Sequence, residues 1–186
     1  MVDDNDKQRD KALQTYQQRI ANTLDDKRAA DVSKRHERGF RSARENLNDL
    51  IDEGTFVEYG QFAVAAQRGR RDYQELQQRT AADGIITGTA TINAADTASN
   101  CRAAVIINDY SVLAGTQGYF HHQKLDRMLS LARQQQLPVV MYTEGGGGRP
   151  GDTDVQVQIA GLNLMTFSAW AGLEGIVPRI AVNNGY

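Results

Sequence analysis

Residues 137–152 read LPVVMYTEGGGGRPGD. The segment begins as a short apolar run typical of a buried strand and continues into four consecutive glycines, residues 145–148. The same arrangement occurs one unit earlier, in residues 103–125 (AAVIINDYSVLAGTQGYFHHQKL), where Gly115 and Gly118 lie between an apolar run and an amphipathic helix. Two successive strand–glycine–helix units predict an α/β fold with right-handed crossovers.

The other apolar runs extend this alternation. We expect strands at residues 54–60, 83–93, 101–110, 137–144 and 177–186, and helices at residues 118–136 and 155–175. The polar residues 68–81 fit either a helix or a loop. The last expected strand is followed by no element that would cover it, so we expect the chain to be a truncated part of a longer polypeptide.

The first 52 residues predict a long helical arm. Apolar residues recur there at spacings of three and four in two sets, Leu13, Tyr16, Ile20 and Leu24, and Phe40, Ala43, Leu47 and Ile51. Gly39 is a candidate break between them. The apolar stripe suits contact with another subunit, and it equally suits packing on the core of its own domain. We expect residues 53–186 to form the main domain.

Composition narrows the class of protein. The chain has 186 residues and a net charge of −2, which argues against a nucleic-acid-binding polyelectrolyte. Cys101 is the single cysteine, so no internal disulfide can form, and we expect it to be a buried or edge thiol. The charged N-terminus lacks the apolar stretch of a secretory signal. We expect a cytoplasmic protein that does not cross a membrane.

The glycine run has several possible roles. A phosphate-binding P-loop requires Lys-Ser/Thr after its last glycine, and here Arg149-Pro150 follows. Gly146, Gly148 and Gly151 match a dinucleotide fingerprint in spacing, but no helix is expected to begin inside it. Two readings remain. One is an oxyanion hole, in which glycine N–H groups at a strand end stabilise a developing negative charge; the other is a flexible surface loop.

Other reactive side chains suggest no competing site. His121 and His122 begin the expected helix 118–136 without further ligands at metal spacing, so we expect no bound metal. We interpret both histidines as surface residues at the helix start, with contact to the edge of a substrate as the alternative. Trp170 lies in an apolar helical stretch and is expected in the core.

Four motifs, in order, resemble the carboxyltransferase component of biotin-dependent acetyl-, propionyl- and other acyl-CoA carboxylases. ARENLNDLIDEGTFVE resembles that family's A-R-E-R-I-x-x-L-x-D-x-G-S-F-x-E, and ADGIITGTATIN its D-G-V-V-T-G-x-G-x-I. VIINDYSVLAGTQGYFHHQKLDRMLSLA resembles its D-F-T-V-x-G-G-S-x-G strand and helix, and LPVVMYTEGGGGRPGD its P-V-I-x-x-x-D-S-G-G-A-R loop. The resemblance covers residues 38–186. The TEGGGGRPGD form is most similar to single-chain or fused carboxylases.

The resemblance implies a crotonase-like spiral of ββα units. It implies that the backbone N–H groups of Gly146 and Gly147 form the oxyanion hole that holds the thioester enolate. Gly145 and Gly148 stand where the family has serine and alanine, which leaves the donor assignment open by one residue. The further substrate-binding candidates are Gly115, Gly118, Gly145, Gly148, Arg149 and Lys124. Arg149 and Lys124 are candidates for CoA phosphates, with an internal anchor and a solvated lysine as the respective alternatives.

The resemblance also implies the reaction and the partners. The carboxyl group would pass from carboxybiotin, carried on a separate domain or subunit, to the α-carbon of an acyl-CoA. Expected partners are the biotin carboxyl carrier, the biotin carboxylase, a homologous C-terminal carboxyltransferase domain and further copies of the enzyme. This chain would be the acyl-CoA-binding half, inactive alone. The alternatives are a crotonase-type hydratase or isomerase, which would require a glutamate pair, and a non-catalytic CoA-binding or subunit-interaction fragment.

Overall fold

The computed structural model describes residues 4–97, 101–155 and 164–183. The elements along the chain are α1 (Asp4–Ala21), η1 (Asp25–Arg28), α2 (Ala29–Glu37), α3 (Ala43–Leu50), β1 (Val57–Glu58), α4 (Tyr73–Arg79), η2 (Ala81–Gly84), β2 (Ile85–Thr91), β3 (Arg102–Asn108), η3 (Leu113–Gly115), α5 (Tyr119–Gln135), β4 (Val139–Thr143), α6 (Thr166–Ala171) and β5 (Arg179–Asn183). Much of the expected helix 155–175 lies outside the described residues.

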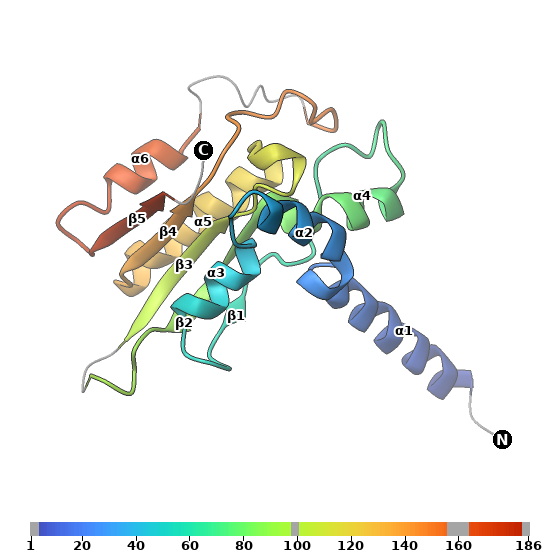
Figure 1. Cartoon of the computed structure of the whole chain (residues 1–186), viewed down its shortest axis with the longest axis horizontal. Coiled ribbons are helices and arrows are strands. Elements are labelled where there is room, and N and C mark those ends of the chain that lie inside the picture. Colours follow the sequence, from blue (N-terminus) through green and yellow to red (C-terminus); the bar gives the residue numbers. More distant parts are fainter. Residues whose placement is uncertain (1–3, 98–100, 156–163, 184–186) are drawn as a thin grey trace.

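The strands form one sheet in the order β1-β2-β3-β4-β5 (Figure 1). The pairs β1/β2 and β2/β3 are antiparallel, whereas β3/β4 and β4/β5 are parallel. In the register of the parallel part, Ala104 faces Val139, and Val139 faces Arg179. Because parallel strands end at the same edge of a sheet, the turns that follow β3 and β4 lie side by side.

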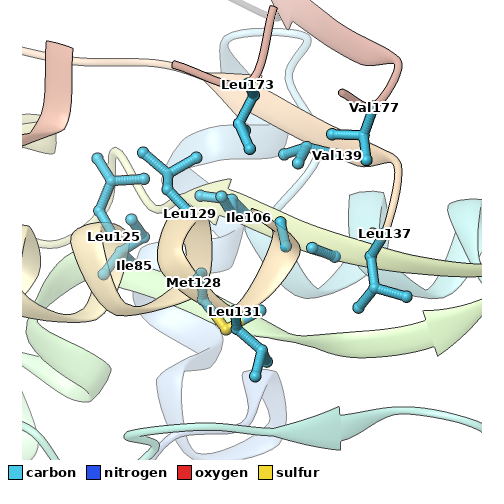
Figure 2. Close-up of a cluster of buried hydrophobic side chains, with 12 residues drawn as sticks. Ile85, Ile106, Leu125, Met128, Leu129, Leu131, Leu137, Val139, Leu173 and Val177 are labelled. Carbon is cyan, nitrogen blue, oxygen red and sulfur yellow. The ribbon is translucent and has the colours of Figure 1, made fainter. Parts of the chain in front are cut away.

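Helices cover both faces of the sheet. Alternate residues of a strand point to opposite faces, so Ile106 faces α5 while Val105 and Ile107 face α3. The larger cluster, shown in Figure 2, packs Leu125, Met128 and Leu129 of α5 against the sheet, with further side chains from the segment around β4 and β5. Trp170 packs partly buried against this cluster, in agreement with its expected place in the core.

The two apolar stripes of the arm differ in how far they are buried. Ala43 and Leu47 of the second stripe are buried in the cluster under α3, so this stripe packs on the chain's own core. In the first stripe, on α1, Leu13 and Tyr16 remain 52% and 53% exposed. Figure 1 shows α1 extending away from the sheet. Arg19 nevertheless contacts the main domain, with its guanidinium 4.4 Å from the centre of the Phe62 ring.

Local sequence signals explain where the arm bends. Gly39 adopts φ +77° directly after α2, and this left-handed conformation favours glycine. Ser42 then begins α3 with a capping box: its side chain accepts from the Glu45 N–H, and the Glu45 carboxylate accepts from the Ser42 N–H. Within the part of the chain that the structure describes, no helix combines the length and apolarity needed to cross a membrane.

Candidate active site

The two glycine turns join at the carboxyl edge of the sheet. The Gln117 N–H donates to the Gly147 carbonyl at 2.8 Å, and the Arg149 N–H donates to the Gln117 carbonyl at the same distance. These bonds form a short parallel bridge between Gln117 and Gly148. The Gly146 N–H donates to the Gly115 carbonyl at 3.1 Å. The two strand–glycine–helix units predicted from the sequence therefore build one continuous backbone surface.

This pairing decides which N–H groups remain available. The donors of Gly146 and Arg149 are both bonded to carbonyls of the neighbouring turn. Among the described residues, no acceptor is paired with the N–H of Gly147 or Gly148. Residues 145–148 are all exposed. Gly147 and Gly148 thus have unbonded N–H groups in the exposed loop, whereas the N–H of Gly146 is already bonded.

Close backbone contact explains two of the glycines. A Cβ placed on Gly146 would lie 2.6 Å from the Ala114 carbonyl oxygen, far inside normal contact distance. One placed on Gly115 would lie 3.1 Å from the Gly145 Cα, and Gly115 also has φ +68°. Gly147 adopts φ +80° with open space around it. The backbone conformation therefore explains why position 147 favours glycine, and the space beside it is free for a ligand.

A buried ion pair holds the start of the glycine loop. Glu144, the last residue before the loop, is 5% exposed, and both of its carboxylate oxygens accept from Nη2 of Arg35, at 2.7 and 2.9 Å. Burial raises the pKa of Glu144, and Arg35 opposes the rise. The loop therefore begins at a residue that is fixed to helix α2 of the arm.

A second buried cluster holds the end of the loop. Arg149 is 5% exposed and forms an ion pair with Asp83, while its Nη2 donates to the Thr116 carbonyl at 2.6 Å. Asp83 also accepts from the His121 N–H at 2.8 Å, and Asp152 accepts from the Tyr119 N–H at 2.8 Å. Both carboxylates thus cap the N-terminus of α5, where the helix dipole favours negative charge.

The predicted phosphate ligands are consequently not available to a ligand. Arg149 has its guanidinium satisfied inside the protein, which matches the anchoring alternative. Lys124 is 9% exposed, so the expectation of a solvated lysine is wrong. Its Nζ donates to the carbonyls of Ala82 (2.8 Å) and Ile85, and burial lowers its pKa to about 7. Neither cation is exposed enough to bind a phosphate group from solvent.

Gly118 also has a structural role. It is buried, and a Cβ placed on it would collide with the guanidinium of Arg149 and the carboxylate of Asp152. The predicted substrate-binding residues therefore divide into two groups. Gly145, Gly147 and Gly148 face solvent in the loop, and the remainder, Gly115, Gly118, Lys124 and Arg149, form the support beneath it.

The histidines differ from their expected position on the surface. His121 is 1% exposed, its Nδ1 lies 3.2 Å from the Asp83 carbonyl, and burial lowers its pKa to about 3. His122 is 4% exposed, and its Nδ1 lies 3.1 Å from Oγ1 of Thr166. No group of three metal-ligating side chains occurs among the described residues.

An apolar pocket that sequence reasoning did not predict lies beside the loop. The pocket has a volume of about 240 Å³, and its walls come from α5, β4 and α6. Its lining includes Gln117, Leu125, Leu129, Met141, Phe167 and Trp170. Gln117 is the residue that bridges to Gly148, so the pocket lies next to the unbonded N–H groups of the loop.

Comparisons with known proteins agree with this geometry. The family profile "Carboxyl transferase domain" matches residues 34–183. The propionyl-CoA carboxylase beta chain of Cereibacter sphaeroides is 30% identical over 156 residues, which are 83% of this chain and 28% of that protein.

Solved structures extend the likeness. A single-chain, multi-domain long-chain acyl-CoA carboxylase is 49% identical with a TM-score of 0.85, over 92% of this chain and 17% of the other. The beta subunit of the P. aeruginosa geranyl-CoA carboxylase is 26% identical with a TM-score of 0.68, over 91% of this chain and 29% of the other. The chain thus spans less than a third of the relatives it matches. It belongs to the carboxyl transferase domain family, and its five-stranded sheet and helices have the crotonase-like fold of that family's carboxyltransferases.

Proposed function

We propose that this chain is the acyl-CoA-binding half of the carboxyltransferase of a biotin-dependent acyl-CoA carboxylase. The observation that carries the proposal is the pair of unbonded N–H groups of Gly147 and Gly148 in an exposed loop, held between two buried ion-pair anchors. In this proposal, residues 1–52 are a helical arm and residues 53–186 the domain that binds the thioester.

The chemistry follows from the acidity of a thioester. Loss of an α-proton places negative charge on the carbonyl oxygen, and two aligned N–H donors stabilise that enolate more than the neutral thioester. One such donor contributes roughly 10²–10³ in rate in enzymes that use an oxyanion hole. Gly147 and Gly148 can supply both donors, because among the described residues neither N–H group has an acceptor.

In this proposal, other domains or subunits supply the remaining components of the reaction. Carboxylated biotin, carried by another domain or subunit, would supply the carboxyl group. Biotin carboxylase, the carrier, a homologous carboxyltransferase domain and further copies of the enzyme are the partners that we propose, in the cytoplasm. The relatives named as beta chains and as a single-chain, multi-domain enzyme support an assembly of this kind. Alone, the chain would bind acyl-CoA without completing the transfer.

The structure argues against the hydratase or isomerase alternative. That chemistry requires a glutamate that can exchange protons with the substrate. Glu144 is the glutamate adjacent to the loop, but it is buried and both of its oxygens accept from Arg35. Its carboxylate is therefore occupied by a structural interaction and is not directed at a bound thioester.

Calorimetry with two ligands tests the proposal. A palmitoyl-CoA thioester should bind this chain more tightly than the thioether analogue, in which CH₂ replaces the carbonyl. Equal affinities would mean that the loop does not bind the carbonyl. Catalysis is tested separately in the full-length protein that contains this segment: Gly147→Ala should lower kcat for carboxyl transfer. An unchanged kcat would contradict the assignment of Gly147 to the oxyanion hole.

A further inference from the structure

The turn before β2 has an uncommon backbone conformation. Ala82, Asp83 and Gly84 all have positive φ, at 51°, 51° and 74°, and all three are buried. For alanine and aspartate this left-handed conformation costs free energy, because the Cβ comes too close to the following carbonyl oxygen. Such a backbone persists only where the surrounding structure holds it. The contacts of residues 82–84 therefore decide whether the turn keeps this shape.

Helix α5 holds this turn through a buried cation. Nζ of Lys124 donates to the carbonyls of Ala82 (2.8 Å) and Ile85, so one ammonium group bonds to both ends of the turn. One helical turn earlier, Nδ1 of His121 lies 3.2 Å from the Asp83 carbonyl. Hydrogen bonds from an ammonium group are charge-assisted and stronger than those between neutral groups. Lys124 thus ties residues 82 and 85 together across the left-handed stretch.

The turn presents Asp83 to the anchor of the glycine loop. The Asp83 side chain is buried and forms an ion pair with Arg149, the residue that follows the four glycines. Arg149 donates from Nη2 to the Thr116 carbonyl and from its backbone N–H to the Gln117 carbonyl. The bonds of Lys124 go to the turn and not to the loop. A change in the direction of Asp83 would therefore reach the loop through Arg149.

The cost of burying a lysine supports a specific role at this position. Burial lowers the pKa of Lys124 to about 7, while the charges of Glu58 and Asp83 oppose this shift and that of Arg44 adds to it. An apolar side chain would occupy the same space without the cost of burying a charge. The contribution that an apolar side chain cannot make is the pair of hydrogen bonds to the turn.

We propose that Lys124 is a positioning residue for the glycine loop. Lys124 keeps residues 82–84 in their left-handed conformation. That conformation directs Asp83 at Arg149, and the ion pair sets the path of the loop at its C-terminal end. The inference rests on the proposed function, because the shape of the loop matters for the reaction only if its N–H groups bind the thioester carbonyl.

The test uses substitutions that separate the turn from general stability. Lys124→Met removes the N–H donors. Ala82→Gly/Lys124→Met also introduces a residue that adopts positive φ without steric cost, so the turn no longer needs the ammonium group. Leu131→Ala is the control, because it weakens the buried core of the same helix without removing a polar contact. Should Lys124→Met alone fail to fold, Lys124→Gln, which keeps an N–H donor group on a shorter side chain, takes its place.

Two measurements are made on each variant, under conditions where it is folded. NMR records the amide signals of residues 145–149 in this chain without ligand. Steady-state kinetics gives kcat and KM for carboxyl transfer in the full-length protein that contains this segment. The first measurement reports on the loop alone, and the second reports on its use in the reaction.

The proposal predicts a loss that glycine at position 82 reverses. Lys124→Met should shift the amide signals of residues 145–149 and lower kcat roughly tenfold or more, with KM changed by less than about threefold, because misaligned donors stabilise the enolate less. Ala82→Gly/Lys124→Met should recover most of both, and Leu131→Ala should change neither. Unchanged loop signals in Lys124→Met, no recovery in the double variant, or equal shifts in Leu131→Ala would overturn the inference.

The proposed function fails by a different result. The loop signals could shift in Lys124→Met and return in the double variant while kcat stays constant in all variants. Lys124 would then position the loop, and the loop would not serve the reaction. That result would count against the oxyanion hole and not against the role of Lys124.

Discussion

Arg35 of α2 donates to both carboxylate oxygens of Glu144, the residue from which the glycine loop begins. Seven residues earlier, Arg28 donates to Asp109 at 2.7 Å, just after the end of β3. The arm therefore binds the carboxyl ends of both strands that lead into the glycine turns. A segment far away in sequence fixes the start of the loop, so loop geometry should depend on the arm.

The first prediction concerns this dependence. Removing one partner of a buried ion pair leaves the other charge unpaired, so Arg35→Ala should lower the free energy of unfolding by about 3–5 kcal/mol. Hydrogen exchange of the amides of residues 145–148 should also become faster. Arg44→Ala is the matched control, because Arg44 forms a comparably buried pair with Glu58 on β1, away from the loop. Equal rates of amide exchange at residues 145–148 in the two variants, compared at equal stability, would contradict the dependence of the loop on the arm.

The second prediction concerns pH. Burial lowers the pKa of Lys124 to about 7, whereas an unfolded lysine titrates near 10.5. Between these values the unfolded chain binds more protons, so the Lys124 contribution makes stability rise with pH from about 7 to 10.5, by at most about 1.4 kcal/mol per pH unit. Below pH 7 the contribution is constant.

Urea unfolding across that range measures this contribution. Lys124→Met keeps an unbranched side chain, one atom shorter, and removes the titrating group, so the difference in stability between the two proteins should grow in favour of the unmodified chain as pH rises. A difference that is independent of pH would show that Lys124 titrates normally in the folded protein.

The third prediction separates two glycines. A methyl group on Gly118 would collide with Arg149 and Asp152, so Gly118→Ala should destabilise the fold by about 1–3 kcal/mol, as overpacking does. A Cβ on Gly145 would have its nearest neighbour, the Gly115 carbonyl oxygen, at 3.5 Å, an ordinary contact. Gly145→Ala should therefore change stability by much less. Similar unfolding midpoints for the two variants would contradict the proposed packing of Gly118.

The repeated strand–glycine–helix pattern was predictable because it is local. An apolar run, a glycine turn and an amphipathic helix each appear as contiguous residues, and β3 with α5 confirms the pattern. The second stripe of the arm was predicted with its packing left open, and Leu47 shows that it packs on the chain's own core.

The burial of polar residues was not predictable in the same way. Lys124 and His121 lie in a helix whose pattern gives no reason for burial, and their partners are the backbone around Ala82 and Asp83. These contacts depend on η2, where Ala82 and Asp83 both adopt a positive φ of 51°. Such a conformation is rare outside glycine and has no clear sequence signal. The partners are thus set by tertiary structure.

The donors in the glycine loop depend on pairing between two turns. Four identical residues carry no information about which N–H groups face outward. The bridge between Gln117 and Gly148 engages the Arg149 N–H, and a separate bond engages the Gly146 N–H with the Gly115 carbonyl, so the N–H groups of Gly147 and Gly148 are left unbonded among the described residues. The predicted pair of Gly146 and Gly147 therefore shifts by one residue in our proposal, to Gly147 and Gly148.

The most direct test of the central claim is an NMR titration that follows the amide signals of residues 146–148. The account predicts that palmitoyl-CoA moves the Gly147 and Gly148 amide protons downfield, that its thioether analogue does not, and that Gly146 shifts little because its N–H is already bonded. Equal shifts with both ligands, or the largest shift at Gly146, would contradict the assignment of the thioester oxygen to these two groups.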